Sequence, residues 1–326
     1  MNKYHFISLL CLVLVFSMVL AACEPTENPE PTSTLEQMPT ETIVPKTEPV
    51  MVTDGLGRSI RLDAPAKSIV SMAPSNTEIL FAIGAGSQVV GRDEFSDYPP
   101  EAKDIANIGG GFGDYNLEVI TSLQPDLILA SSLQPSELIQ TLEDLGFTVF
   151  VLANPTEMEG LFSNLMIVAE LTGHQSQASM LVESLRNRVK AVEEKIATVD
   201  DPILVFYELD ATDPKAPWTA GPGTFVDTLI SMAGGVNLGS KMQGEWVQIS
   251  VEEIIIQDPD VIILGDYTWG GVTPEDVASR TGWEGLSAVQ TSRVYPFDDN
   301  LVSRPGPRLV VGLEEMARLL YPNLFE

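Results

Sequence analysis

The sequence predicts an α/β protein in which a single long helix joins two lobes of mainly parallel sheet, and three observations support this. Short apolar segments of strand length alternate with segments of helical periodicity, as expected for parallel sheets covered by helices. Residues 175–198 keep one helical pattern over about 36 Å, which is long enough to bridge two lobes. Two segments 134 positions apart resemble each other, which indicates that the lobes are related.

The alternation of strands and helices begins near residue 68. A buried strand is expected at 68–72, and the pattern Ser75-x-x-Glu78 that follows is a capping box that predicts a helix over 79–83. Gly84 and Gly86 end this helix. Further strands are expected at 89–91, 126–130, 147–152, 203–207, 260–264 and 293–297. Further helices are expected at 116–124, 135–145, 158–171, 175–198, 224–233, 250–256 and 309–320.

The long helix at 175–198 has apolar residues at spacings of three and four, and Pro202 follows its end. A segment of this length suits a connection between two lobes. The alternative is an ordinary helix that covers one sheet.

The two similar segments each contain a cap residue, a Glu two positions later, a short helix and a Pro-Asp pair that enters a strand. Asn116 and Glu118 correspond in this way to Ser250 and Glu252, with a constant offset of 134. The pattern predicts that each lobe presents a Glu on the first turn of an equivalent helix. The alternative is that each Glu only stabilises its own helix, because a carboxylate there is favoured by the helix dipole.

The composition is that of a globular protein with a strong negative charge. Hydrophobic residues make up 44% of the chain. The chain has 46 Asp and Glu residues and 18 Lys and Arg residues, which gives a formal net charge of −28. This balance disfavours nucleic-acid binding, which needs a basic face, and electrostatic docking to anionic lipid.

The motifs of the common enzyme classes do not appear. The Cys residues are Cys11 and Cys23, and the His residues are His5 and His174, which exclude a structural zinc site or a Cys/His dyad in the folded part. No phosphate-binding glycine loop, Gly-x-Ser-x-Gly elbow or EF-hand spacing is present. We therefore predict neither an enzyme nor a protein with a metal site or cofactor.

The first residues predict export and a lipid anchor. A short n-region with Lys3 precedes an apolar segment, residues 6–20, and the segment ends in Leu20-Ala21-Ala22-Cys23. This junction resembles a bacterial lipobox, so residues 1–22 are interpreted as a lipoprotein signal peptide and Cys23 as the lipidated residue. The alternative is an ordinary signal peptide. Residues 23–50 are rich in Pro, Thr and Glu and predict a disordered linker.

Aromatic residues in Gly/Pro-rich loops are candidates for a ligand pocket. Phe95 and Phe112 lie near Pro or Gly clusters, as do Trp218 and Trp246. Loops at the carboxyl ends of strands can line a cleft between α/β lobes. The alternative for each residue is packing of its loop against the sheet.

Several segments carry a family resemblance: IVSMAPSNTE at 69–78, SDYPP at 96–100, NLE at 116–118 with PDL at 125–127, and SRPGPR at 303–308. On these segments, the chain from about Val52 to Phe325 resembles the substrate-binding proteins of ABC importers for iron-siderophores, haem and vitamin B12. The segments 71–78 and 96–100 are most similar to the vitamin B12-binding branch. The resemblance implies two Rossmann-like lobes joined by a stiff helix, the class III periplasmic-binding-protein fold, with the ligand between the lobes.

The resemblance also implies roles for individual residues. Glu118 and Glu252 match the paired acids that meet arginines on the two copies of the permease. Phe95, Phe112 and Trp246 match positions that contact the corrin ligand. Two further residues, Trp218 and Arg304, are placed at the ligand by their loops, and Arg304 and Arg308 have the alternative of capping local carbonyls.

The expected ligand is a corrinoid such as cobalamin, because a large and nearly neutral flat molecule suits a cleft lined by Phe and Trp. Haem is an alternative that Tyr98, Tyr115, Tyr207 or Tyr267 could support through iron. Anionic ferric siderophores need a basic cleft, and this chain is poor in Lys and Arg. Zinc and manganese relatives use clustered His residues, which are absent here.

The sequence thus predicts a monomeric, lipid-anchored extracytoplasmic receptor that delivers a corrinoid to an ABC permease dimer with its ATPase subunits. The N-terminal lobe is expected at 51–155, the helical segment at 156–199 and the C-terminal lobe at 200–326. The competing hypotheses are an extracytoplasmic hydrolase that uses carboxylates and a non-transport adhesin or scaffold.

Overall fold

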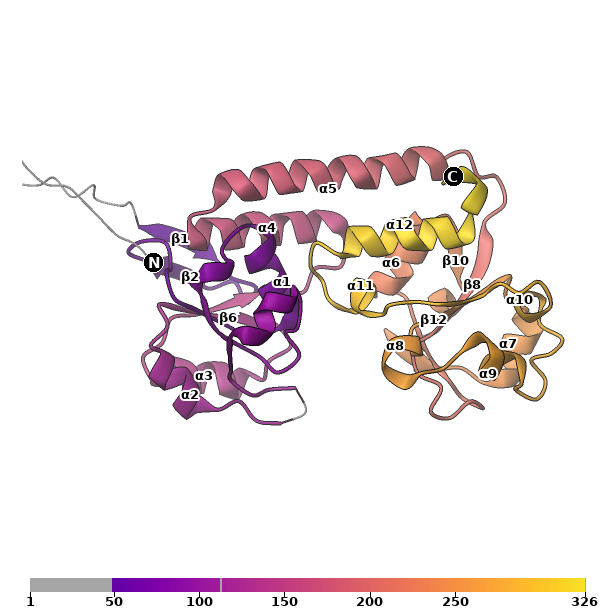
Figure 1. Cartoon of the computed structure of the whole chain (residues 1–326), viewed down its shortest axis with the longest axis horizontal. Coiled ribbons are helices and arrows are strands. Elements are labelled where there is room, and N and C mark those ends of the chain that lie inside the picture. Colours follow the sequence, from indigo (N-terminus) through magenta and orange to yellow (C-terminus); the bar gives the residue numbers. More distant parts are fainter. Residues whose placement is uncertain (1–48, 112, 326) are drawn as a thin grey trace, which may run out of the picture. The chain divides into compact units, whose positions relative to one another are not determined.

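The computed structural model describes residues 49–111 and 113–325, and the chain from Thr47 onwards forms one compact unit (Figure 1). The predicted signal peptide and Cys23, and almost all of the predicted linker, lie outside the described residues. Within the described part, no helix has the length and apolar character needed to cross a membrane.

The N-terminal lobe is built on a parallel sheet of five strands in the order β5-β4-β3-β6-β7. The central strands are apolar on both faces, because helices cover both sides of the sheet. The strands are β3 (Ile69–Ser71), β4 (Val89–Arg92), β5 (Ala106–Asn107), β6 (Leu127–Ser131) and β7 (Val149–Leu152). The helices are α1 (Pro74–Ala82), α2 (Leu117–Leu123) and α3 (Ser136–Asp144). An antiparallel hairpin of β1 (Val50–Thr53) and β2 (Ser59–Leu62) precedes them.

The C-terminal lobe is built on a parallel sheet of four strands in the order β10-β8-β12-β13. These strands are β8 (Ile203–Glu208), β10 (Gly235–Asn237), β12 (Val261–Leu264) and β13 (Val294–Pro296). The helices are α6 (Phe225–Met232), α7 (Val251–Gln257), α8 (Tyr267–Gly270), α9 (Pro274–Ala278), α10 (Ser287–Gln290), α11 (Asn300–Ser303) and α12 (Leu309–Leu320). A small antiparallel pair of β9 (Trp218–Ala220) and β11 (Trp246–Gln248) completes the lobe.

The two lobes share one topology. When the two-residue edge strand β5 is left aside, the first strand of each sheet lies between the second and the third, and the fourth strand follows the third. The aligned Pro-Asp pairs enter β6 and β12, and Asp126 and Asp260 each accept a backbone N–H from the neighbouring central strand or the residue before it. The internal similarity predicted from the 134-residue offset is therefore present in the structure.

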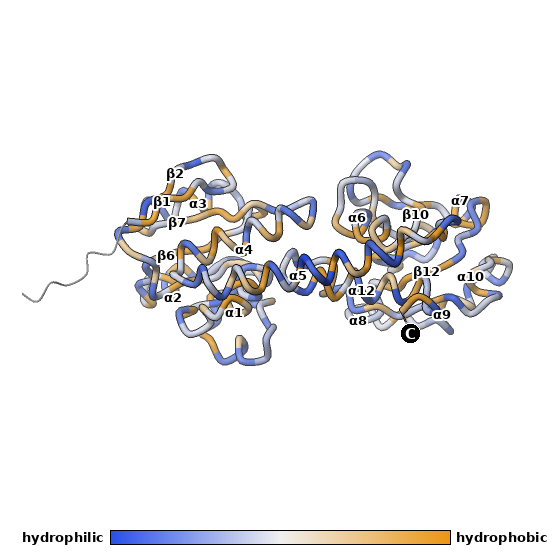
Figure 2. The backbone as a smooth tube through the Cα atoms, turned by 90° about the horizontal axis from the view of Figure 1, so that it is seen from above, coloured by the Kyte–Doolittle hydropathy of each residue, from blue (hydrophilic) through white to orange (hydrophobic). Residues whose placement is uncertain are grey.

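Helices α4 (Met158–Thr172) and α5 (Gln175–Ile196) lie against each other and connect the lobes. Gly173 ends α4 in the left-handed conformation, with φ of 81°, which allows the chain to turn back into α5. Figures 1 and 2 show α5 extending from α4 to the C-terminal helix α12. Arg186 pairs with Glu159 on α4, and Arg188 pairs with Glu314 on α12. The expected long connecting helix is confirmed, and it rests on both lobes.

The predicted capping box at the start of α1 is wrong. The helix begins at Pro74, with Ala73 as the N-cap residue and no capping side chain, because proline at the first position already has a helical φ. The polar side chains of the motif make buried tertiary contacts instead. Asn76 donates to the carbonyl of Leu129 at 3.0 Å, and the Thr77 hydroxyl lies 2.7 Å from that of Ser71.

Candidate functional site

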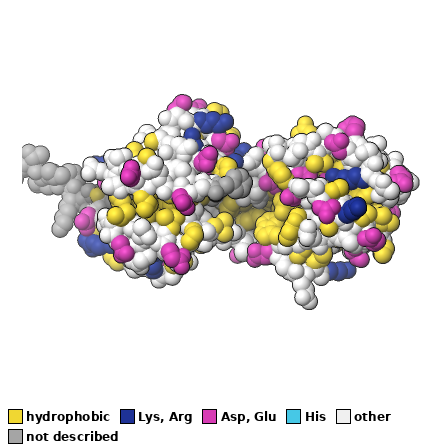
Figure 3. Space-filling model, turned by 90° about the horizontal axis from the view of Figure 1, so that it is seen from below, with side chains coloured by type: hydrophobic (Ala, Val, Ile, Leu, Met, Phe, Trp, Pro, Cys, Tyr) yellow, Lys and Arg dark blue, Asp and Glu magenta, His cyan; other side chains and the backbone are white. Residues whose placement is uncertain are grey.

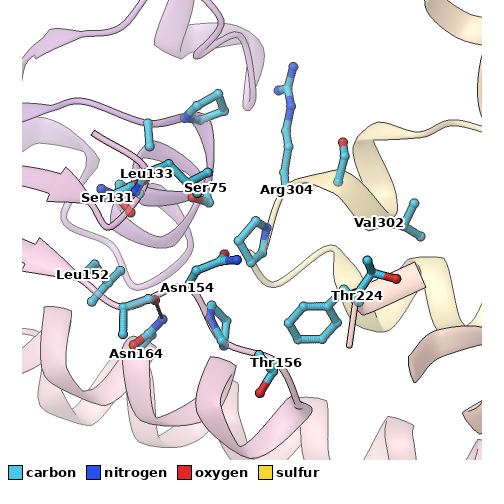
Figure 4. A pocket seen from close by; sticks show the side chains of 18 of the residues that line it. Ser75, Ser131, Leu133, Leu152, Asn154, Thr156, Asn164, Thr224, Val302 and Arg304 are labelled. Atoms are coloured by element: carbon cyan, nitrogen blue, oxygen red, sulfur yellow. Dashed lines mark hydrogen bonds between the residues drawn. The ribbon is translucent and has the colours of Figure 1, made fainter. Parts of the chain in front are cut away.

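A cavity of about 320 Å³ lies between the lobes. The N-terminal lobe lines it at the start of α1 and at the carboxyl ends of β6 and β7, where α/β proteins place their ligands. Figure 4 shows Ser75, Ser131 and Leu133 on one side of this space, and Thr224 and Val302 on the other. Its volume is at the lower end of the range for small-molecule pockets.

The lining of the cavity includes both apolar and polar side chains, and large apolar side chains on both lobes are exposed there. Leu133 of the N-terminal lobe is 79% exposed and Trp246 of the C-terminal lobe is 47% exposed, although both line the cavity. Figure 3 shows hydrophobic side chains on both lobes next to the hollow between them. Among the described lining residues, the charged ones are Glu245 and Arg304. The arrangement suits a ligand with a large apolar face and little net charge.

The two tryptophans lie on the β9–β11 pair, so the prediction that they belong to irregular loops is wrong. The register pairs Trp246 with Ala220 and Trp218 with Gln248, which places both tryptophans on the same face of the two strands. Trp246 lines the cavity, and Trp218 does not, although its side chain is 39% exposed. Two edge strands of three residues have no alternation that sequence reasoning could detect.

The aromatic residues of the N-terminal lobe are less central than the sequence predicted. Phe95 is 41% exposed and is not among the residues that line the cavity. Its ring lies against the turn at Gly111, where an added Cβ would approach it to 2.9 Å. Phe112 lies outside the described residues.

Arg304 lines the cavity and belongs to a cluster of ion pairs between the lobes. Its Nη1 lies 2.6 Å from Asp97 Oδ1 and 3.6 Å from Glu78 Oε1. Arg308 binds the Glu78 carboxylate through Nε and Nη2, at 2.9 and 2.5 Å. The Arg308 guanidinium also lies 4.0 Å from the centre of the Tyr98 ring. Both arginines therefore bind carboxylates of the N-terminal lobe, in place of the carbonyl caps considered from the sequence.

Burial and pairing act in opposite directions on the two carboxylates of this cluster. Glu78 is almost fully buried, and desolvation raises its pKa in spite of the bonds from Arg308 and Arg304. Burial also acts to raise the pKa of Asp97, but the hydrogen bond and charge of Arg304 outweigh it and lower that pKa. Since the segment that carries both arginines follows α11, the cluster fastens the C-terminal lobe to α1.

Glu118 and Glu252 occupy the same position on equivalent helices. Each is the second residue of its helix and is exposed. The cap side chains accept from the backbone N–H of the third helical residue in both cases, Asn116 at 3.0 Å and Ser250 at 3.2 Å. The structure thus presents two exposed carboxylates in matching local settings, one on each lobe.

A second buried cluster in the C-terminal lobe had no signal in the sequence. Glu208 is fully buried and forms a bidentate ion pair with Arg280. Asp266 is 1% exposed, accepts from the backbone N–H of Ala211 through Oδ2, and has no hydrogen-bond partner for Oδ1 among the described residues. Burial, followed by the charge of Glu208, raises the pKa of Asp266 to about 7.

We expect Asp266→Asn to raise the melting temperature more at pH 8 than at pH 5. A carboxyl group with a raised pKa in the folded state favours folding at low pH, and this contribution is lost as the pH rises from 3.8 through about 7. The Asn side chain keeps an oxygen that can accept the backbone N–H of Ala211, and it has no carboxyl group that titrates. Thermal unfolding of both proteins from pH 5 to pH 8 measures the difference, with the exposed Asp63→Asn as control. An equal shift at both pH values would contradict the buried titration.

No group of three or more His, Cys, Asp or Glu residues in the described part of the chain is arranged to hold a metal ion.

Comparisons with known proteins agree with this architecture. The family described as "Periplasmic binding protein" matches residues 69–301. The chain is 35% identical over 288 residues to YvrC of Bacillus subtilis, an uncharacterized ABC transporter substrate-binding lipoprotein, with 86% of this chain and 89% of the relative covered. The vitamin B12-binding protein BtuF of Vibrio cholerae has a TM-score of 0.68 at 27% identity, with 80% and 99% covered.

The haem-binding protein RhuT of Roseiflexus sp. RS-1 is similar to the same degree, with a TM-score of 0.70 at 27% identity and coverage of 79% and 99%. These structures confirm the expected class III periplasmic-binding-protein fold. The chain belongs to the periplasmic binding protein family, the solute-binding proteins of ABC transporters, and is not an enzyme.

Proposed function

We propose that the chain is a lipid-anchored extracytoplasmic receptor that binds a corrinoid between its lobes and delivers it to an ABC importer. The observation that carries the ligand class is the composition of the cavity. Exposed apolar side chains border it on both lobes, and Arg304, the lining residue with a positive charge in the described part, is already paired. Burying flat apolar surface supplies the binding free energy, and no charge has to be neutralised.

Haem is the second candidate, because RhuT, a haem-binding protein, shares the fold. Haem iron would take a Tyr ligand here. The hydroxyl of Tyr115 donates to Met72, and that of Tyr207 donates to Asp299, so both are engaged within the lobes. Tyr98 and Tyr267 are 43% and 45% exposed and keep the haem alternative open, although neither lines the cavity.

A titration of residues 47–326 with a panel of ligands tests this proposal. Cyanocobalamin, cobinamide, haem and a ferric siderophore are added in turn, and tryptophan fluorescence reports binding. We expect the corrinoids to quench the fluorescence at the lowest concentrations, because Trp246 lines the cavity. Tighter binding of haem than of either corrinoid would favour the second candidate.

We expect Trp246→Ala to weaken corrinoid binding by about 1–3 kcal/mol, because the truncation removes aromatic contact area. Trp218→Ala is the matched control, since Trp218 lies on the same strand pair, is similarly exposed and does not line the cavity. Titration of both variants compares the dissociation constants. An equal loss in the two variants would indicate that the strand pair, and not a ring contact at the ligand, determines affinity.

The lipid anchor is proposed from the Leu-Ala-Ala-Cys junction, and YvrC is a lipoprotein by its name. We expect Cys23→Ala to move the full-length protein from the detergent phase to the aqueous phase in a cloud-point partition, because the acyl chains that hold it are attached to Cys23. The full-length wild-type protein is the reference. Unchanged partition of the variant would contradict lipidation at Cys23.

Glu118 and Glu252 are proposed as the residues that dock the loaded receptor on the permease. Each would form a charge-assisted hydrogen bond with an arginine on one copy of a two-fold permease. Their exposure and matching local geometry support this role.

A further inference from the structure

We propose that Asp97, together with Glu78, determines the charge class of the ligand by neutralising Arg304. The inference rests on the proposed function, because it concerns the same cavity, and it adds the residues that discriminate between ligands. A ligand with little net charge is accepted, and an anionic ligand is rejected.

The contacts of Arg304 carry this inference. Both of its ion pairs use Nη1, at 2.6 Å from Asp97 and 3.6 Å from Glu78, and its side chain is only 15% exposed. Glu78 is shared, because it also holds Arg308 through two hydrogen bonds. The cluster contains two cations and two carboxylates, so its formal charge is zero. Figure 4 shows the Arg304 side chain extending away from Asn154 and Thr156.

An anionic ligand in the cavity would have to compete with these carboxylates. Arg304 Nη2 and Nε take no part in these ion pairs, but a carboxylate or phenolate that accepted from them would lie beside Asp97, whose negative charge would repel it. A neutral amide group or an apolar face of a ligand is not repelled by these carboxylates. The second charged lining residue, Glu245, adds a further negative charge.

Asp97 is the member of the cluster that can be changed with little effect on the fold. Its side chain is 48% exposed, whereas Glu78 is 2% exposed and pairs with two arginines. Removing the Asp97 charge leaves Arg304 with the distant and shared Glu78 carboxylate. The cavity then holds a cation that an anionic ligand can use.

The test compares Asp97→Asn with the wild-type protein in titrations with haem, which carries two propionates, and with cyanocobalamin. Asp63→Asn is the matched control, because Asp63 also pairs with an arginine, Arg61, but is exposed and lies directly after β2. We expect Asp97→Asn to bind haem roughly tenfold more tightly and cyanocobalamin within about twofold of the wild type, since one charge-assisted hydrogen bond is gained. The gain should shrink at high salt and disappear when Arg304→Gln is added.

The outcomes separate this inference from the proposed function. Failure of the wild-type protein to bind any corrinoid contradicts the proposed function. The ratio of the haem dissociation constants of the variant and the wild type is measured independently of that result. An unchanged haem affinity in Asp97→Asn, no haem binding by that variant, or an equal gain in Asp63→Asn would overturn the role of Asp97. An intact melting temperature of Asp97→Asn shows that the comparison is between folded proteins.

Discussion

Replacing both Glu118 and Glu252 with alanine is expected to reduce delivery of ligand to the permease by about tenfold or more, while the affinity for ligand stays unchanged. Each substitution removes one carboxylate and with it one charge-assisted hydrogen bond to an arginine of the permease. The two contacts are linked through one rigid receptor, so losing both costs more than losing either one. Neither residue lines the cavity, which is why ligand binding is spared.

The measurement is uptake by the reconstituted permease with ligand-loaded receptor, over a range of receptor and salt concentrations. Glu253→Ala is the matched control, because Glu253 lies on the first turn of the same helix as Glu252 and interacts with the same helix dipole. Screening should weaken wild-type docking as salt rises, and the double variant should lose this dependence. Normal uptake by the double variant would show that the two glutamates only stabilise their own helices.

Local patterns in the sequence predicted most of the fold because they were strong and regular. The apolar spacing of α5 follows from the burial of one helix face. The equal placement of Glu118 and Glu252 follows from the capping of two equivalent helix starts. Gly173 and the Pro-Asp pairs marked boundaries through backbone preferences that need no tertiary partner. Such signals survive in a single sequence.

The remaining features depend on partners that are far apart in the chain. The motif Ser75-x-x-Glu78 predicts a capping box that does not form, because its Glu pairs with Arg308, 230 positions away. Asp266 and Glu208 look like ordinary acids in a chain that has 46 of them. Their buried positions follow from the packing of the lobe, which no local pattern encodes. The site was therefore predicted in part, and its electrostatics only emerge from the fold.

The Glu78–Arg308 pair leads to the largest expected loss of stability. Replacing Arg308 with Met should lower the free energy of unfolding by about 3 kcal/mol, because Glu78 is left buried with only a distant contact to Arg304. The loss should be larger at pH 8 than at pH 5. Burial already raises the pKa of Glu78, and removing Arg308 raises it further, so low pH relieves the cost by protonating the carboxyl.

Urea unfolding at pH 5 and pH 8 measures this effect. Arg188→Met is the control, because Arg188 and Glu314 form a similar bidentate pair between α5 and α12 but are 39% and 26% exposed, and such a pair contributes at most about 1 kcal/mol. Adding Glu78→Leu to Arg308→Met should recover much of the loss, since an apolar pair has no charge to desolvate. Equal losses in Arg188→Met and Arg308→Met, or no recovery in the double variant, would mean that burial of Glu78 is not what makes the pair important. The pair would then fasten the lobes no more firmly than an ordinary surface contact.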